Sequence, residues 1–513
     1  MPTAARARRN TIADAFARAA ARYTGTALHF AGRDWTHADL HAAAGRLANR
    51  LAALGLRPGD RVAAYGRNSD AYVLLWLACG RAGLVHVPVN YALTPPELGF
   101  IVRQCAAAAL ICDAELQSNL APSREAGTLR LLGTFTGGAD FDVLATALDD
   151  TLSPHHDAAI SDEDLAQLIY TSGTTAAPKG AAMTHHALLA EYESCIHALE
   201  FHARQRDLTA LPLYHAAAMH CFMMPMLLAG AFVHLIPAPA PDTVLALIER
   251  HRLTSLFAPP TVWIGLLRHP DFATRDLTSL THVYYGASIM PVPVLHELRA
   301  RLPGVRTFNC YGQSEIGPLA TVLAPEDHDA HPGSVGRPVL NVETRLVDPE
   351  MNDVPVGETG EIVHRSPQLL TEYWQNPEAT AAAFAGGWFH SGDVGRMDEH
   401  GFLHIVDRIK DVINTGGVLV ASRDVEEALF THPAVSEVAV IGVPDPKWIE
   451  AIAAVVVVRQ GHEVDEPALI AHARAHLAPY KLPKRIIFAD DLPRNTAGKL
   501  LKRELRRMHA EPG

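Results

Sequence analysis

The chain has 513 residues, of which 48% are hydrophobic and 19% are charged. This length is enough for more than one hydrophobic core, because single cores stop growing at roughly 250–300 residues. A formal net charge of -12 gives no attraction to a nucleic-acid backbone, so we expect no nucleic-acid partner. Six scattered cysteines without a CxxC pair indicate reduced, mostly buried thiols of a cytoplasmic protein.

Neither a signal peptide nor a membrane span is predicted. The basic N-terminus MPTAARARRN is not followed by an apolar segment. No stretch of about 20 apolar residues exists, so we expect no transmembrane segment. The nearest candidate, residues 223–236, is interrupted by Pro225 and His234. We interpret it as a buried strand and turn.

The predicted elements alternate along the first four hundred residues. Helical periodicity over residues 11–55 ends at Gly55 and Pro58. Strand-like and helical runs then alternate at residues 61–65, 71–82, 85–89, 255–258, 261–267 and 282–285. Alternation of this kind predicts layered α/β subdomains with largely parallel strand pairing.

The pattern of predicted elements changes after Gly401. Short helices and strands follow one another at residues 424–430, 435–442, 451–458, 467–477 and 499–508. They indicate a small α+β unit of about a hundred residues, which is a normal domain size. We therefore predict an α/β protein with a large N-terminal domain over residues 1–408 and a small C-terminal α+β domain over residues 409–513.

The strongest local motif is YTSGTTAAPKG, residues 170–180, which follows an apolar strand end. Small hydroxyl residues and glycine let backbone N–H groups approach an anion, and Lys179 supplies a positive charge. It differs from a Walker A loop because Gly180, rather than Ser or Thr, follows the lysine. The motif indicates a phosphate site, and the alternative is a solvated turn.

Four further motifs follow. In NCYGQSE, residues 309–315, an aromatic ring and a glycine can flank a purine, and Glu315 can ligate Mg²⁺. In GWFHSGDVG, residues 387–395, Asp393 offers a turn carboxylate for two ribose hydroxyls. The sequence DRIKD, residues 407–411, precedes a glycine pair, and PRNTAGKLLKRE, residues 493–504, places Lys499 where a helix is expected to begin. Taken singly, each motif is also compatible with an ordinary turn or a basic helix.

In this order and spacing, the five motifs resemble the adenylate-forming superfamily of acyl-CoA synthetases, stand-alone adenylation domains and firefly-type luciferases. The resemblance runs from about Thr11 to Leu505 and includes LPLYH at 211–215, YGAS at 285–288, GETGE at 357–361 and LAPYKLP at 477–483. Its motifs look most like those of bacterial fatty-acyl-CoA synthetases. The resemblance implies that a carboxylate attacks the α-phosphate of MgATP to give acyl-AMP, and that a thiol then displaces AMP. It also implies a mobile C-terminal domain that rotates between the two steps.

The resemblance further implies a role for each motif residue. The β- and γ-phosphates would be held by Thr171, Ser172, Gly173, Thr174, Thr175 and Lys179. The adenine would lie between Tyr311, Gly312 and Gln313 on one side and Gly286, Ala287 and Ser288 on the other. Ser314 and Glu315 would contact the α-phosphate and Mg²⁺, Asp393 and Arg408 the ribose, and Gly416 and Gly417 the coenzyme A tunnel, with Lys410 at the hinge. Lys499 would bridge the substrate carboxylate and the α-phosphate, because two anions must be brought into contact there.

One departure from the family pattern concerns the tunnel. The family usually continues with a Glu-Asn pair after the two glycines, whereas this chain has Val418 and Leu419. The inference about the tunnel mouth is weaker for that reason.

The acid pocket is expected near Tyr214, Met219, Phe222, Val262, Tyr285, Ile316 and Leu319. His215 resembles the family's gate beside the reacting carboxylate, so the catalytic candidates are His215, Glu315 and Lys499. We interpret His220 as an ordinary hydrogen-bonded core histidine, and we expect no zinc site at the paired histidines. Residues 208–241 contain no Asp or Glu that could pair a substrate ammonium, which argues against an α-amino acid.

We therefore predict a ligase that uses ATP, Mg²⁺ and coenzyme A to activate an apolar carboxylic acid, with fatty acids favoured and aryl acids not separated from them. One alternative is transfer to the phosphopantetheine of a carrier protein. An alternative of another class is a non-catalytic acyl- or nucleotide-binding protein. The oligomeric state stays open, with a homodimer as one arrangement.

Overall fold

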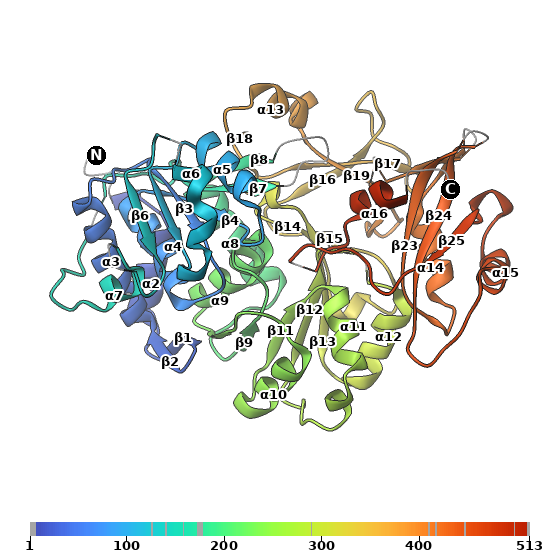
Figure 1. Ribbon diagram of the computed structural model, residues 1–513, viewed down its shortest axis with the longest axis horizontal. Helices are drawn as coiled ribbons and strands as arrows, with labels where there is room; N and C mark the ends of the chain where they lie inside the picture. The colour runs from blue at the N-terminus through green and yellow to red at the C-terminus, as the bar shows by residue number, and fades with distance from the viewer. Residues whose placement is uncertain are drawn as a thin grey trace.

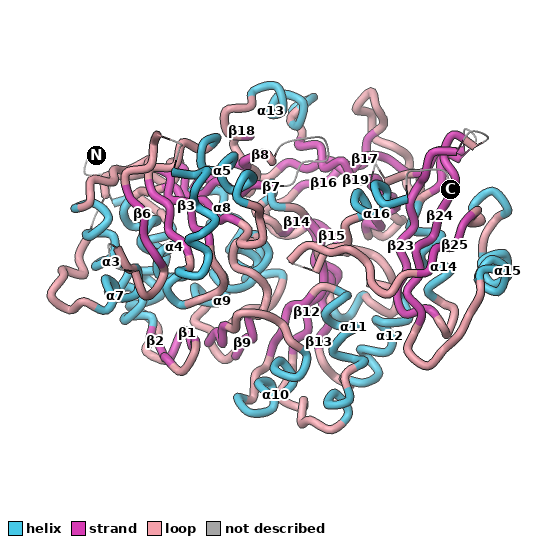
Figure 2. The backbone as a smooth tube through the Cα atoms, in the orientation of Figure 1, coloured by secondary structure: helices cyan, strands magenta, loops and turns pink. Residues whose placement is uncertain are grey.

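The computed structural model describes residues 7–124, 127–138, 141–156, 158–171, 178–288, 290–408, 411–415, 418–445, 448–496 and 498–509. Its strands form sheets of nine, seven, five and four strands, and helices cover the two large sheets (Figures 1 and 2). The last strands and helices of the chain form a smaller lobe at one side of the molecule (Figure 1). The predicted fold class, a large α/β part with a small α+β part, is confirmed.

The seven-stranded sheet has the order β18-β8-β7-β4-β3-β5-β6. Its strands are β3 (Arg61–Tyr65), β4 (Val85–Val89), β5 (Ala109–Cys112), β6 (Leu131–Thr134), β7 (Leu165–Thr171), β8 (Lys179–Thr184) and β18 (Glu372–Tyr373). Strands β7 and β8 pair antiparallel, with Thr171 opposite Lys179. The two ends of the phosphate motif therefore lie side by side at one edge of this hairpin.

The nine-stranded sheet has the order β15-β14-β13-β12-β11-β9-β10-β1-β2. Its strands are β1 (Thr26–Phe30), β2 (Arg33–Thr36), β9 (Arg206–Thr209), β10 (Phe232–Leu235), β11 (Ser255–Ala258), β12 (His282–Gly286), β13 (Arg306–Gly312), β14 (Leu319–Leu323) and β15 (Arg337–Pro338). Strands β12 and β13 pair in parallel, with Gly286 opposite Cys310. Their carboxyl ends carry two of the predicted site segments to the same edge of the sheet, where ligands of open α/β sheets usually bind.

The helices of the large part are α2 (Ile12–Arg22), α3 (His37–Ala53), α4 (Asp70–Ala82), α5 (Pro95–Gln104), α6 (Ala121–Arg124), α7 (Val143–Leu148), α8 (His185–Ala198), α9 (Met224–Leu228), α10 (Pro241–His251), α11 (Pro260–Arg268), α12 (Val292–Arg301) and α13 (Pro377–Ala383). A π-helical segment, η2 (Ala217–Met223), precedes α9. Helices α2 and α3 each begin with a threonine capping box, formed by Thr11 with Asp14 and by Thr36 with Asp39. Helix α4 is buried on nearly every side because it is hydrophobic all round.

Short 3₁₀ helices are η1 (Ala114–Leu120), η3 (Pro270–Ala273), η4 (Ser314–Ile316), η5 (Pro325–Asp327), η6 (Ala385–Gly387) and η7 (Pro479–Lys481). The four-stranded antiparallel sheet contains β16 (Glu343–Val347), β17 (Thr359–Arg365), β19 (Phe389–Met397) and β20 (Leu403–Arg408). The C-terminal lobe contains β21 (Ile413–Thr415), β22 (Val418–Val420), β23 (Val435–Asp445), β24 (Ile449–Val458), β25 (Arg485–Phe488), α14 (Ser422–Phe430), α15 (Glu466–His476) and α16 (Lys502–His509). The predicted domain boundary after residue 408 falls between β20 and β21.

Four sequence expectations about local structure were wrong. The helical interpretation of residues 11–55 missed the β1–β2 hairpin, whose strands complete the edge of the nine-stranded sheet. The segment 223–236 begins with helix α9 before strand β10, so it is only partly a strand. Asp393 lies inside strand β19 rather than in a turn. Lys499 precedes helix α16, which begins at Lys502.

All six cysteines are buried and unpaired, as the sequence predicted. Among the described residues, no helix combines the length and the apolarity needed to cross a membrane.

Candidate active site

Glu315 lies at the junction of the two large sheets, in the short helix η4 that follows strand β13. Its side chain is largely buried, and Oε1 accepts hydrogen bonds from Thr171 Oγ1 at 3.1 Å and Tyr373 Oη at 3.2 Å. Lys179 Nζ lies 5.1 Å from the centre of the Tyr373 ring. The structure thus brings a carboxylate, two hydroxyls and an ammonium group together from four separate segments.

A second polar pair lies where the four-stranded sheet meets strand β13. The Asp393 carboxylate accepts a hydrogen bond from Tyr311 Oη at 2.8 Å, and Arg408 Nε lies 3.3 Å from its other oxygen. Asp393 and Arg408 face each other across the β19–β20 ladder. Burial raises the pKa of the Tyr311 hydroxyl well above its usual range, and the neighbouring Asp393 carboxylate raises it further. Tyr311 therefore stays a hydrogen-bond donor to Asp393.

The ends of strands β12 and β13 approach each other with little space between them. A Cβ on Gly286 would lie 2.2 Å from the backbone oxygen of Cys310, so only glycine fits there. Ala287 follows with a φ of 62°, a left-handed conformation that is rare for alanine. Ser288 follows Ala287. On the neighbouring strand β13, Gly312 is the last residue, and Gln313 and Ser314 follow it.

Gln313 carries a buried amide nitrogen that has no hydrogen-bond partner among the described residues. An unsatisfied buried N–H donor costs about 1–3 kcal/mol. A ligand with an acceptor atom, such as a purine, would remove this cost. This observation fits the predicted nucleotide site.

The loop that carries Lys499 docks on the N-terminal part of the chain. Asn495 and Lys499 bond each other twice at 2.9 Å, and Arg494 pairs with Leu500, so residues 494–496 and 498–500 form the two sides of a hairpin. Thr496 Oγ1 contacts the Tyr214 hydroxyl and lies 3.3 Å from Asn90 Oδ1. Thr261 Oγ1 donates to the Gly498 carbonyl at 3.2 Å. Three separate N-terminal segments therefore hold this hairpin.

His215 adjoins the docked hairpin. Burial lowers the pKa of His215, and the nearby positive charge of Lys499 lowers it further, to about 4. The imidazole is therefore neutral near pH 7. Its Nδ1 accepts the backbone N–H of Ala217 at 3.3 Å, which leaves the other ring nitrogen to carry the proton.

The expected acid pocket divides between two hydrophobic clusters. Met219, Phe222, Ile316 and Leu319 are buried in the cluster between the large sheets, and Tyr214 packs against it. The Phe222 ring stacks on Phe257 with centres 4.2 Å apart. The two remaining candidates, Val262 and Tyr285, belong to the neighbouring cluster under helices α10 to α12. Tyr285 Oη contacts His328 Nε2 at 3.1 Å, so its polar end is occupied away from the other candidates.

His220 fits its interpretation as a core histidine. It contacts Tyr192 Oη at 2.8 Å and Gln167 Oε1 at 2.7 Å. Several other predicted site residues lie outside the described part of the chain, namely Ser172, Gly173, Thr174, Thr175, Lys410, Gly416 and Gly417.

Sequence reasoning missed three residues that the structure adds to the site. Tyr373 donates a hydrogen bond to Glu315, and its ring lies beneath Lys179. Thr496 of the docked hairpin contacts Asn90. Thr496 is part of the PRNTAGK motif and could have been named from it. Tyr373 and Asn90 lie outside every motif, so only the folded structure reveals their position.

The comparisons with known proteins agree with this geometry. The AMP-binding enzyme family model matches residues 16–374, and the model of the AMP-binding enzyme C-terminal domain matches residues 424–499. A feruloyl-CoA synthase from an Amycolatopsis species is 39% identical over 482 residues, which cover 94% of this chain and 95% of that protein. The long-chain-fatty-acid–CoA ligase FadD13 from Mycobacterium tuberculosis is 35% identical over 477 residues, covering 93% of each chain.

The fold is also similar to solved structures. The crystal structure of ATP-bound MatB from Rhodopseudomonas palustris superposes with a TM-score of 0.90 at 32% identity, covering 97% of this chain and 99% of that one. The resemblance inferred from the five motifs is therefore confirmed. The chain belongs to the AMP-binding enzyme family and is an adenylate-forming acid–thiol ligase.

Proposed function

We propose that this enzyme converts an apolar aryl-substituted carboxylic acid into its coenzyme A thioester, through an acyl-adenylate and with MgATP. The observation that supports this most strongly is the docked hairpin that carries Lys499, whose Thr496 contacts Tyr214 and whose lysine lies close enough to lower the pKa of His215. In the first step a carboxylate oxygen attacks the α-phosphorus and pyrophosphate leaves. In the second step the thiol sulfur attacks the acyl carbon and AMP leaves.

In the first step, Lys499 neutralises the two anions that must meet. Removing one aimed donor or cation typically costs on the order of 3–4 kcal/mol of transition-state stabilisation. A neutral His215 suits this arrangement, because a second cation would repel Lys499. Phosphoryl transfer otherwise needs mostly positioning and charge neutralisation.

The cluster around Glu315 is the proposed site for the phosphates and the metal ion. Mg²⁺ prefers carboxylate oxygens, and Glu315 offers one that is surrounded by hydroxyls. When bound, the ion would neutralise charge on the phosphate oxygens. Thr171 and Lys179, with residues 172–175, would contact the β- and γ-phosphates. Asp393 and Arg408 would bind the ribose, and Gln313 would donate to the adenine.

The class of acid is argued from the pocket and from the relatives. Residues 208–241 contain no Asp or Glu, so the pocket wall that they form has no carboxylate for a substrate ammonium. In this proposal the stacked rings of Phe222 and Phe257 would offer an aromatic surface to an aryl substrate, since aromatic rings favour stacked or edge-to-face contacts. The feruloyl-CoA synthase is also the more similar of the two relatives described above. A fatty acid is the second candidate, supported by the long-chain relative.

The test measures acid-dependent pyrophosphate release with ferulate, a long-chain fatty acid and a short branched acid. We expect the largest kcat/KM with ferulate. A larger value with the fatty acid would favour the second candidate. Thioester formation is then compared with free coenzyme A and with a purified carrier protein, and transfer to the carrier alone would contradict the proposed acceptor.

The proposed compartment is the cytoplasm. Six buried, unpaired cysteines support a reducing environment.

A further inference from the structure

A buried hydrogen-bonded pair, Glu191 and Gln368, lies behind the loop that follows Glu315. Glu191 is in the middle of helix α8, Gln368 lies in the segment before β18, and both are 0% exposed. Gln368 Nε2 donates a hydrogen bond to Glu191 Oε2. Burying an amide and a carboxyl group is costly unless their hydrogen bonds are made, so their remaining partners are informative.

Both side chains bind the backbone of residues 316–319. The Leu319 N–H donates to Glu191 Oε1 at 3.0 Å. Gln368 Nε2 also reaches the carbonyl oxygens of Leu319 at 3.0 Å and Ile316 at 3.2 Å. The pair therefore holds this loop at both of its ends.

Gly317 allows helix α8 to approach the loop this closely. Its φ is +103°, and a Cβ there would lie 3.1 Å from Glu191 Cβ and 3.2 Å from Glu191 Cγ. A side chain would be strained by this backbone conformation and crowded by the helix. The loop thus packs directly on the aliphatic part of Glu191.

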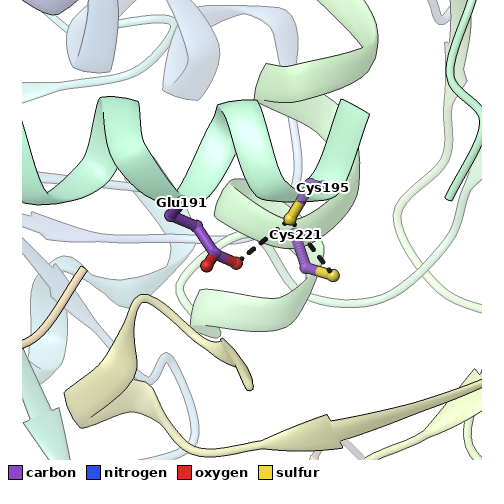
Figure 3. A group of neighbouring side chains, drawn as sticks. All are labelled: Glu191, Cys195 and Cys221. Atoms are coloured by element: carbon purple, nitrogen blue, oxygen red, sulfur yellow. Dashed lines mark hydrogen bonds between the residues drawn. The ribbon is translucent and has the colours of Figure 1, made fainter. Parts of the chain in front are cut away.

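Two other residues of helix α8 hold the pair in place. Ser194 Oγ donates to Gln368 Oε1 at 2.6 Å, which fixes the amide so that its N–H groups face the loop. The Cys195 thiol donates to Glu191 Oε1 at 3.1 Å (Figure 3). Burial raises the pKa of Glu191 to about 8, although the hydrogen bonds from Cys195, Leu319 and Gln368 oppose this rise.

The same carboxyl group belongs to the cluster Glu191, Cys195 and Cys221, whose ligand-type atoms lie within 4.8 Å of one another. Figure 3 shows Cys195 beside both the carboxyl group and Cys221. Burial raises the pKa of both thiols, which keeps them protonated and poor metal ligands. Since the Glu191 oxygens already accept bonds from the loop and from Gln368, this cluster serves as a hydrogen-bonded anchor.

The anchored loop connects two parts of the active site. Glu315, which directly precedes the loop, offers the carboxylate of the proposed metal site, and its carbonyl accepts the Leu370 N–H at 2.8 Å. Ile316 and Leu319 are buried beside Phe222 in the same cluster. A shift of the loop would therefore move the carboxylate and the pocket wall together.

We propose that Glu191 and Gln368 are positioning residues, which hold residues 315–319 in place. They thereby position both the Glu315 carboxylate, used in adenylate formation, and Ile316 and Leu319, which are expected to bind the acid. This inference rests on the proposed function. Displacing a reacting group by about 1 Å can cost roughly 10²-fold in rate. The ribose contact is proposed for Asp393, on strand β19, whereas Gln313 directly precedes the anchored loop, so ATP binding depends on the pair only in part.

The test compares Gln368→Met with Gln205→Met. Gln205 is a second buried glutamine, 1% exposed, and its amide bonds Tyr284 Oη at 3.2 Å. We expect Gln368→Met to raise KM for the acid and to lower kcat of pyrophosphate release, each by about tenfold to a hundredfold, while KM for ATP rises by a smaller factor because Asp393 holds the ribose independently. Gln205→Met should lower the melting temperature by a similar amount but leave these kinetic constants within about threefold of the wild type.

A second variant, Glu191→Gln, keeps the side-chain shape. It tests the same network if the Gln368→Met protein does not fold. It should shift the acid KM in the same direction, and the two changes combined should be less than additive because they act on one network. If both variants only lose stability, as the Gln205 control does, the inference is wrong while the proposed function stands. If the wild type releases no pyrophosphate with any acid, both are wrong.

Discussion

The hydroxyl groups of Tyr214 and Thr496 are in direct contact although 282 positions separate them in the sequence. Tyr214 belongs to the expected acid pocket, and Thr496 lies three residues before Lys499. The contact therefore joins the C-terminal lobe to the expected acid pocket, at the place where we propose that Lys499 supplies a cation.

Removing the Thr496 hydroxyl should weaken this docked arrangement. A neutral hydrogen bond contributes about 0.5–1.5 kcal/mol, so Thr496→Val should lower the rate of acyl-adenylate formation about threefold to tenfold. Thioester formation from supplied acyl-AMP should change less, since it does not need Lys499 in place. Both half-reactions are measured by single-turnover quench. Thr431→Val, which loses a hydroxyl bonded to His472 elsewhere in the lobe, is the matched control. Equal effects of the two variants would contradict the role of Thr496.

Asp393→Asn should weaken ATP binding. A hydrogen bond to a charged group contributes about 1.5–3 kcal/mol, which corresponds to a rise of roughly tenfold to a hundredfold in KM for ATP. Tyr311→Phe should have a smaller effect, because Tyr311 acts through the Asp393 carboxylate. Calorimetric titration with ATP measures the same loss directly. Asp207→Asn changes another buried carboxylate, on strand β9, and should leave ATP affinity unchanged. Unchanged ATP affinity in Asp393→Asn would refute the proposed ribose contact.

His215 should make stability depend on pH in a defined window. Burial and the Lys499 charge lower its folded-state pKa to about 4, below the unfolded value of 6.5. Between these values the unfolded chain binds more protons, so the contribution of His215 to stability is lost as the pH falls from 6.5 toward 4. The free energy of unfolding, followed by urea denaturation at several pH values, should fall less steeply in His215→Gln than in the wild type. Identical slopes would contradict a lowered pKa of His215 in the folded protein.

The sequence predicts the fold class and several strand ends, but not all details of the fold. Thr171 ends strand β7 and Glu315 follows strand β13, as the motifs predict, but these strands belong to different sheets, so the contact between the two residues comes from the packing of one sheet beside the other. The alternation of strands and helices likewise predicts the α/β class. The β1–β2 hairpin was missed because it is short and lies between two strongly periodic helices, which dominate the pattern.

Tertiary contacts that lack a local pattern could not be predicted. Tyr373 is placed against Glu315 by antiparallel pairing of β18 with β8, which local periodicity does not reveal. Glu191 is a charged residue in an apolar helix, and only its contacts with Gln368 and Leu319 explain why it is buried. Such contacts depend on which segments the fold brings together.

The central claim is that Lys499 acts in the first half-reaction only, and single-turnover kinetics of Lys499→Ala test it most directly. We expect acyl-adenylate formation to fall about 10²- to 10³-fold, while thioester formation from supplied acyl-AMP stays within about threefold of the wild type. Lys484→Ala removes a cation that lies over Trp448 in the same lobe, and it should leave both steps unchanged. Equal losses in the two half-reactions, or no loss of adenylate formation, would contradict the account.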